Sequence, residues 1–278
     1  AQARRNVSPY MTGYDDLDSH GDWSTAADYG TVWYPRAVTA DWAPYRYGRW
    51  AWVVPWGWTW VDAAPWGFAP FHYGRWVQIR GRWGWAPGTY IARPVYAPAL
   101  VGWVGNPGWS ASFSSGSSPA VGWFPLAPRE VYVPAYRTSP TYIRQVNVTH
   151  VKNAADIDQA LRPDYRPNYV HYGQPHAVTV VPTGTLRDGR RIDRAAIRPH
   201  DSHELGQAPA AARAPGSEWL APRAGAARPG RHVDEERRPS TPLPGLSERT
   251  PQPAMRAPQA NPEAQQPVRM PESGPRFP

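Results

Sequence analysis

The side chains in this sequence that could do chemistry are mainly aromatic rings with arginines beside them. Flat tryptophan and tyrosine rings stack on sugar faces or nucleobases, and a neighbouring guanidinium donates hydrogen bonds to anionic groups. Of the 16 tryptophans, all but Trp219 lie between Trp23 and Trp123. The residues that could form a binding platform are Trp50, Trp52, Trp56, Trp58, Trp60, Trp76, Trp83, Trp85, Tyr47, Tyr73, Arg49 and Arg75. Their pattern predicts a surface for a glycan or cell-wall polymer, with single-stranded nucleic acid as a more remote alternative.

The interpretation that we favour is that the same tryptophans form the hydrophobic core of a structural or interaction module, with glycan binding as the alternative. The chain contains no cysteine, so disulfides cannot hold short strands together, and large aromatic side chains are the natural substitute. The two interpretations differ in what they predict. Core rings have little exposed area, and alanine at Trp52 or Trp58 unfolds the module. Platform rings stay exposed in a contiguous row, and the same changes leave the fold intact.

Other residue types give little support for catalysis or for a metal site. Zinc needs three or four ligands at defined spacing, whereas the histidines are scattered and are expected on solvent-exposed loops, His72 at an exposed position. The sequence has no G-x-S-x-G elbow, no glycine-rich phosphate loop and no pair of carboxylates flanking a cleft. We therefore expect a non-enzymatic protein with no cofactor and no metal. The histidines concerned are His72, His150, His171 and His176.

An octet of residues occurs twice in the aromatic stretch. Residues 43–50 (APYRYGRW) return as residues 69–76 (APFHYGRW), with six of eight positions identical and an offset of 26 residues. Residues 28–35 are a weaker echo. An offset of this size is typical of a reused supersecondary unit. We interpret the copies as related hairpins in one sheet.

The spacing of the tryptophans predicts short antiparallel strands. Tryptophans on alternate positions from 50 to 60 point to one face of a strand, and Pro55 divides that run into strands near 49–54 and 57–61. The second copy predicts a tight hairpin about Arg80-Gly81, and Asp62 is expected to cap a turn. The fold class expected is mainly β, with little helix and a long disordered C-terminal tail.

Several aromatic, proline and glycine blocks in fixed order resemble a domain of unknown function found in exported proteobacterial proteins. The blocks are VWYPR, WAPYRYGRW, PWGWTWVDAAPWGFAPFHYGRW, RPVYAPALVGWVG, PAVGWFPLAP, EVYVP and NVTHV, between Asp15 and Val181. The domain usually follows a FecR-type β domain, which this chain lacks, and precedes a proline-rich tail. The resemblance implies export to the periplasm or envelope of a Gram-negative bacterium. It implies no activity and no catalytic residues.

The composition divides the chain into four segments. We expect an irregular acidic lead-in at 1–28, a repeat module at 29–151, a small mixed extension at 152–198 and a disordered Pro/Ala/Arg/Gln-rich tail at 199–278. That tail has too little apolar surface to offset the entropy of ordering.

Within these segments the local patterns predict further elements. Strands are expected at 93–104, 120–125, 130–134, 142–151 and 177–181. A flexible loop is expected at 106–119, a helix at 154–161 after the cap Asn153, and a hairpin at 186–192.

The net charge of +8 is carried almost wholly by arginine. From residue 33 to residue 100, seven arginines face Asp41 and Asp62, a balance of +5. This modest charge, without a recognised nucleic-acid module, gives no expectation of nucleic-acid binding. A cell-envelope polymer or a protein is the expected partner. No apolar run reaches the roughly 18 residues of a membrane-spanning helix. No signal peptide is visible, so we expect that it was removed or that the chain is a fragment.

Overall fold

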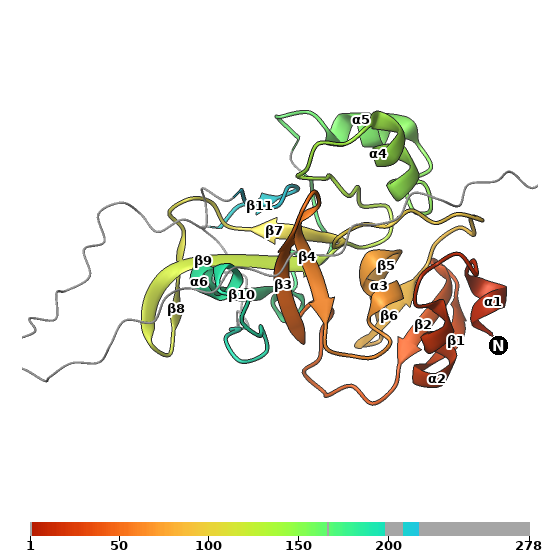
Figure 1. Ribbon diagram of the computed structural model, residues 1–278, viewed down its shortest axis with the longest axis horizontal. Helices are drawn as coiled ribbons and strands as arrows, with labels where there is room; N and C mark the ends of the chain where they lie inside the picture. Colours follow the sequence, from red (N-terminus) through yellow and green to blue (C-terminus); the bar gives the residue numbers. More distant parts are fainter. Residues whose placement is uncertain (1, 166, 198–207, 217–278) are drawn as a thin grey trace, which may run out of the picture. The chain divides into compact units, whose positions relative to one another are not determined.

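Antiparallel β-hairpins make up most of the fold. The computed structural model describes residues 2–165, 167–197 and 208–216 (Figure 1). The strands of these residues all pair antiparallel, which confirms the expected mainly β class. They are β1 (Gly21–Ala26), β2 (Gly30–Pro35), β3 (Gly48–Val53), β4 (Gly57–Asp62), β5 (Arg75–Ile79), β6 (Arg82–Ala86), β7 (Val101–Val104), β8 (Ser110–Phe113), β9 (Gly116–Pro125), β10 (Thr179–Pro182) and β11 (Ala210–Ala211).

Short helices connect the strands. They are α1 (Ala3–Asn6), η1 (Tyr14–Asp16), α2 (Leu17–His20), α3 (Phe68–His72), α4 (Pro140–Asn147), α5 (Ala154–Ala160), η2 (Pro175–Ala177) and α6 (Thr183–Arg187). Within the described parts of the chain, no helix has both the length and the apolar character needed to cross a bilayer.

The first sheet has the strand order β1-β2-β6-β5 and carries a row of tryptophans. Trp23 pairs with Trp33, Trp33 with Trp85, and Trp85 with Trp76. Directly paired residues lie on the same face of a sheet. One face of this sheet therefore presents a ring from every strand, and the three rings beyond Trp23 are fully buried.

The hairpin between β5 and β6 turns at Arg80-Gly81, as the sequence predicts. Both residues have positive φ, 49° and 76°. Positive φ at both central positions defines a type I′ turn, whose twist matches that of the flanking strands.

The other predicted hairpin, β3–β4, forms a separate two-stranded sheet. Trp50 pairs with Trp60 and Trp52 with Trp58, while Pro55 lies in the turn between the strands. The division of the run at Pro55 is therefore confirmed. The prediction that the two hairpins share one sheet is wrong, because β2 occupies the edge of β6 that would have received another hairpin.

The third sheet has the order β10-β9-β7-β11, and β8 also pairs with β9. The Gly/Ser-rich stretch at 106–119, expected to be a flexible loop, instead forms the β8–β9 hairpin. Trp103 pairs with Trp123 in this sheet. Both rings contact Trp50 of the β3–β4 hairpin, at 4.8 and 5.4 Å between ring centroids. Tryptophans thus join two sheets into one core.

The N-terminal segment 1–28 is not the irregular lead-in expected from its acidic composition. Over its described residues it contains α1, η1, α2 and β1, and its apolar side chains Val7, Met11 and Leu17 are buried in the core. Trp33 donates its indole N–H to the carbonyl of Leu17, at 2.9 Å. Asp15 and Asp16 lie between Met11 and Leu17, and the other acidic residues of the segment follow Leu17, so the acidic composition conceals these apolar anchors.

The segment predicted as a strand at 142–151 begins with helix α4 instead. Ser139 caps this helix by accepting the N–H of Tyr142 at 3.1 Å, and Pro140 occupies the first turn. This cap and proline favour a helix start. The strand predicted from the alternation of apolar residues is therefore wrong over the part of the segment that lies in α4.

Four further local predictions can be compared with the structure. Helix α5 starts after the cap Asn153, as predicted, and β10 covers most of the strand expected at 177–181. The strand expected at 130–134 does not form, because residues 130–134 have no regular secondary structure. The hairpin expected at 186–192 is also absent, since α6 and a following turn occupy its place. The disordered tail predicted for 199–278 lies outside the described residues, except for 208–216.

Candidate functional site

Most of the tryptophans proposed as a platform are buried. Their exposed fraction is 9% or less at Trp50, Trp58, Trp60, Trp76, Trp83 and Trp85. A ring without exposed area cannot stack on a ligand. Trp52 is 55% exposed, and Trp56 is partly exposed. The structure therefore offers no contiguous exposed row along the hairpins.

Some of the tyrosines and arginines of the predicted platform are likewise buried, and others are partly or fully exposed. Tyr47 is partly exposed and Arg49 is exposed, whereas Tyr73 and Arg75 are buried. The Arg75 guanidinium donates to the carbonyl of Glu130 at 3.1 Å and to Oδ1 of Asn147 at 2.9 Å. Burial lowers the pKa of Arg75 to about 10, so it stays charged at neutral pH. Arg75 therefore ties strand β5 to the end of α4 and has no free face for a ligand.

Two of the histidines expected on solvent-exposed loops are buried instead. The Nδ1–H groups of His72 and His171 donate hydrogen bonds to the carbonyls of Ala97 and Pro125, each at 2.8 Å. Burial lowers the pKa of both side chains to about 4. They are neutral core residues, and Nδ1 is the atom that carries the proton toward each carbonyl. Within the described residues no group of three or more His, Cys, Asp or Glu side chains could hold a metal ion.

Asp62 is confirmed as a turn-capping residue. Its carboxylate accepts the N–H of Ala64 at 2.8 Å and the indole N–H of Trp60 at 2.8 Å. Burial raises its pKa to about 6. Both hydrogen bonds are local, so the carboxyl group positions the end of β4.

Partly exposed aromatic rings from the turn of the β3–β4 hairpin and from α4 contact one another, as Trp56 and Tyr142 do at 6.2 Å between centroids; Figure 1 shows these two elements. Trp56 contacts Tyr96 and Tyr136, at 5.6 and 5.2 Å between centroids. Phe68 stacks on Tyr96 at 6.1 Å and is itself exposed. We call the following set the aromatic belt: Trp56, Phe68, Tyr96, Tyr136 and Tyr142.

The tyrosines of the aromatic belt are held by hydrogen bonds. The hydroxyl of Tyr142 donates to the carbonyl of Tyr96 at 2.8 Å, and the hydroxyls of Tyr136 and Tyr142 are hydrogen-bonded to each other. Burial raises the pKa of all three phenols. The belt is therefore an uncharged, pre-ordered surface of rings and hydroxyl groups.

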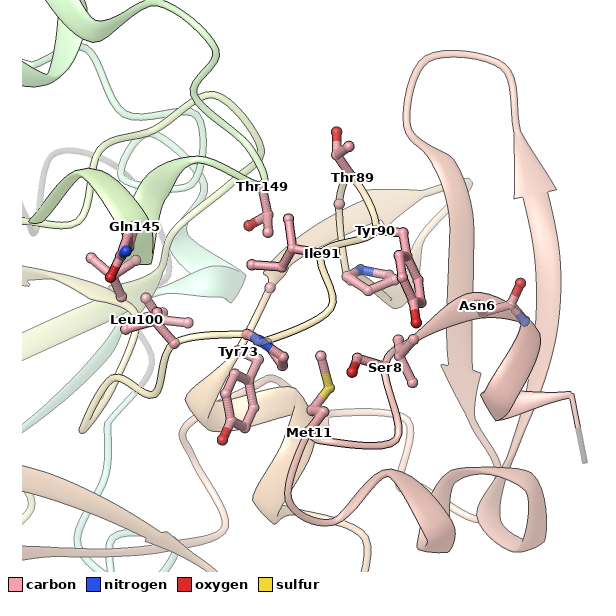
Figure 2. Close-up of a pocket in the computed structure, with 17 residues that line it drawn as sticks. Asn6, Ser8, Met11, Tyr73, Thr89, Tyr90, Ile91, Leu100, Gln145 and Thr149 are labelled. Carbon is pink, nitrogen blue, oxygen red and sulfur yellow. The ribbon is translucent and has the colours of Figure 1, made fainter. Parts of the chain in front are cut away.

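A narrow pocket lies where the N-terminal segment, the loop after β6 and α4 meet. Figure 2 shows Ser8, Met11, Tyr73 and Tyr90 reaching this space from separate segments. Its volume is about 30 Å³, enough for about two groups of the size of a water molecule. We call it the Tyr90 pocket; its lining residues are Asn6, Val7, Ser8, Met11, Tyr73, Gly74, Pro87, Gly88, Thr89, Tyr90, Ile91, Pro94, Val95, Leu100, Gln145, Val146 and Thr149.

The Tyr90 pocket adjoins the aromatic belt. Tyr73 lines the pocket and contacts Tyr96 of the belt, with ring centroids 6.4 Å apart. Helix α4 supplies Gln145 to the pocket and Tyr142 to the belt. The two features therefore share structural elements.

Three wider hollows surround the β1–β2 turn at Asp28 and Tyr29. Their volumes are about 620, 620 and 450 Å³, and all three are open to solvent. Charges of both signs line them, such as Asp28 with Arg129 and Lys152 in one hollow. This mixed lining selects no single class of ligand.

Residues outside the tryptophan run form much of the candidate surface. Sequence reasoning proposed Trp56 but not the other four members of the belt, because they are far apart in the chain and show no common spacing. It missed the Tyr90 pocket entirely. The pocket depends on residues 6–11, which were predicted to be an irregular lead-in.

The site belongs to a mainly β module without a recognised catalytic arrangement. Residues 14–130 match a family of unknown function (DUF6600). The search of curated proteins found no match, and the search of solved structures found none. The family match supports an uncharacterised domain over these residues and assigns them no activity.

Proposed function

We propose that this protein is a non-enzymatic interaction module of the bacterial cell envelope, exported to the periplasm or beyond. Export and the FecR-type neighbour are expectations from the sequence resemblance. The core arrangement of the tryptophans supports a structural role for most of the aromatic content. The aromatic belt is the part of that content left available for a partner.

The ligand class that we propose is a glycan of the envelope. The observation that carries this proposal is the uncharged aromatic belt, in which partly exposed rings lie beside ordered tyrosine hydroxyls. Apolar ring faces pack against the C–H faces of sugars, and the hydroxyls can exchange hydrogen bonds with sugar hydroxyls. The arginines proposed in the sequence analysis are not part of this surface: Arg75 is buried, and Arg49 makes no contact with the belt residues.

The proposal is tested by binding of the full chain to purified peptidoglycan sacculi and to insoluble cellulose. We expect saturable binding to at least one polymer, and a loss of about tenfold in affinity for Trp56→Ala, which corresponds to about 1.4 kcal/mol. Tyr29→Ala is the matched control, since Tyr29 is an exposed ring of the β1–β2 turn and lies outside the belt. Unchanged binding by Trp56→Ala, or binding to neither polymer, would overturn the glycan proposal.

Salt dependence separates a glycan from a nucleic acid. An uncharged surface gives an affinity that changes little with salt, whereas phosphate binding weakens steeply. Cell fractionation with antibodies to this chain tests the export proposal. Recovery in the cytoplasmic fraction alone would contradict it.

A further inference from the structure

We propose that the Tyr90 pocket is a subsite for the acetamido group of an N-acetylated amino sugar, whose glycan chain lies on the aromatic belt. This inference rests on the proposed glycan-binding function. It goes beyond that function because it names the sugar class and the residues that select it.

The size of the pocket selects a small substituent. A volume of about 30 Å³ holds about two water-sized groups, which corresponds to the carbonyl and the methyl of an acetamido group. A whole sugar ring is too large to enter. The ring must therefore stay at the mouth of the pocket while its substituent is inside.

The charge of the pocket wall selects a neutral group. None of its 17 lining residues is charged. A carboxylate or phosphate would lose its hydration there without gaining a cationic partner, which is costly. An acetamido group carries no net charge and so avoids that cost.

The chemistry of the wall matches both halves of an acetamido group. Val7, Met11 and Leu100 offer apolar surface to the methyl. The side chains of Tyr90, Thr149 and Gln145 line the same space, and within the described residues their polar groups make no hydrogen bond to the protein. They are therefore available to the carbonyl oxygen and the N–H of the ligand.

The pocket is preformed. The Ser8 hydroxyl donates to the carbonyl of Ala92 and accepts the N–H of Tyr10 at 3.1 Å. These bonds fasten the N-terminal segment to the loop that carries Tyr90. A wall held in place before binding costs less ordering entropy when the ligand arrives.

The mouth of the pocket offers a place for the sugar ring. The Tyr90 side chain is 56% exposed, so one part of its ring lines the pocket and another faces solvent. The contact between Tyr73 and Tyr96 connects the pocket with the aromatic belt. Because Tyr73 is itself buried, this contact places the two features one side chain apart, and in the proposal the glycan chain runs over the surface from the belt to the mouth at Tyr90.

The test compares two soluble oligosaccharides that differ in the acetamido group. The full chain is titrated calorimetrically with chitohexaose, a hexamer of N-acetylglucosamine, and with cellohexaose, which has hydroxyls at those positions. We expect chitohexaose to bind about tenfold more tightly, as one or two additional hydrogen bonds would give. Thr149→Phe, which places a ring in the pocket, is expected to remove this preference and to leave cellohexaose binding unchanged.

A matched control is available at the neighbouring position. Val148 is exposed and does not line the pocket, so Val148→Phe should keep the tenfold preference. Urea unfolding verifies that each variant folds. If Thr149→Phe does not fold, Tyr90→Ala at an exposed position takes its place and should also reduce the preference.

The outcomes distinguish the two proposals. Equal binding of both oligosaccharides by the unsubstituted chain, or a preference that persists in Thr149→Phe, would overturn the acetamido subsite and leave glycan binding standing. Binding of neither oligosaccharide, together with no binding to sacculi or cellulose, would overturn both.

Discussion

The two copies of the octet have nearly the same sequence but different surroundings. All eight residues of the second copy, 69–76, are buried, whereas in the first copy, 43–50, Tyr47 is partly exposed and Arg49 is exposed. The second copy forms α3 and the start of β5, which joins a four-stranded sheet. The first copy leads into a two-stranded sheet. Burial is therefore decided by the neighbours of each copy rather than by its own residues.

The arginines show this difference most clearly. Arg75, at the seventh position of its copy, is fixed by Glu130 and Asn147, whereas Arg49 at the same position is exposed. In the first copy the fixed arginine is Arg46, which donates to the carbonyl of His176 at 2.9 Å and to the hydroxyl of Thr179 at 3.1 Å. Each copy thus uses one arginine to hold a distant segment, but at a different position.

The third position of the octet joins the two copies. Tyr45 and Phe71 pack edge to face, with ring centroids 4.8 Å apart, and the Tyr45 hydroxyl donates to the carbonyl of Phe71 at 3.0 Å. The hydroxyl that distinguishes these two residues is therefore used in the contact between the copies.

The largest predicted effect tests whether both copies are equally part of the core. Trp50→Ala and Trp76→Ala should each lower the free energy of unfolding by about 3–5 kcal/mol, because each removes a fully buried ring. Trp52→Ala, on the same face of the β3–β4 hairpin as Trp50, should cost less than about 1 kcal/mol. Urea unfolding followed by circular dichroism measures all three. Equal losses at positions 50 and 52 would contradict the burial pattern.

The next effect concerns the two arginines at the seventh position. Arg75→Met should lower the free energy of unfolding by about 3 kcal/mol, since it removes the donors to the Glu130 carbonyl and one of the two donors to Oδ1 of Asn147, the other being the N–H of Tyr132. Arg49→Met should change it by no more than about 0.5 kcal/mol. The same unfolding assay applies. A similar loss of unfolding free energy for both variants would show that the arginine contributes equally to stability in the two copies.

The smallest predicted effect is a pH dependence of the free energy of unfolding, caused by His72 at the fourth position of the second octet. His72 has a pKa lowered to about 4 by burial, below the 6.5 of an exposed histidine. It therefore contributes stability that is complete above pH 6.5 and is lost as the pH falls toward 4. Between pH 6.5 and pH 5 the contribution of His72 to the free energy of unfolding should fall by about 1.5 kcal/mol. Urea unfolding of His72→Gln should therefore show a decrease over this range that is smaller by that amount. Arg49, an exposed arginine of the first copy, does not titrate in this range, so Arg49→Gln should leave the dependence of stability on acid pH unchanged.

The sequence predicted well where local rules decide the structure. The Pro55 break, the Arg80-Gly81 turn and the Asn153 cap depend on backbone geometry within a few residues, and all three are confirmed. Trp56, which the sequence placed in the predicted platform because it lies in an aromatic run, also belongs to the aromatic belt; its role in binding stays a prediction.

Long-range packing is what sequence reasoning could not supply. The alternation of tryptophans placed Trp50 and Trp52 on one face but could not show that only the base of the hairpin would be covered by Trp103 and Trp123. Nothing about Arg75 in the sequence identified Asn147, 72 residues away, as its acceptor. The aromatic belt and the Tyr90 pocket likewise depend on segments that only the complete fold brings together.

The bonds of Arg46 have a consequence for how the chain folds as it is made. Three of its four acceptors lie 130 to 133 residues later in the sequence, the fourth being the nearby carbonyl of Asp41, and strand β10 joins β9 from the same late segment. Contacts of such high sequence separation slow folding. During synthesis the tryptophan hairpins emerge well before the residues that complete their cover. Until then their apolar faces are uncovered, which is the condition under which incompletely folded chains aggregate.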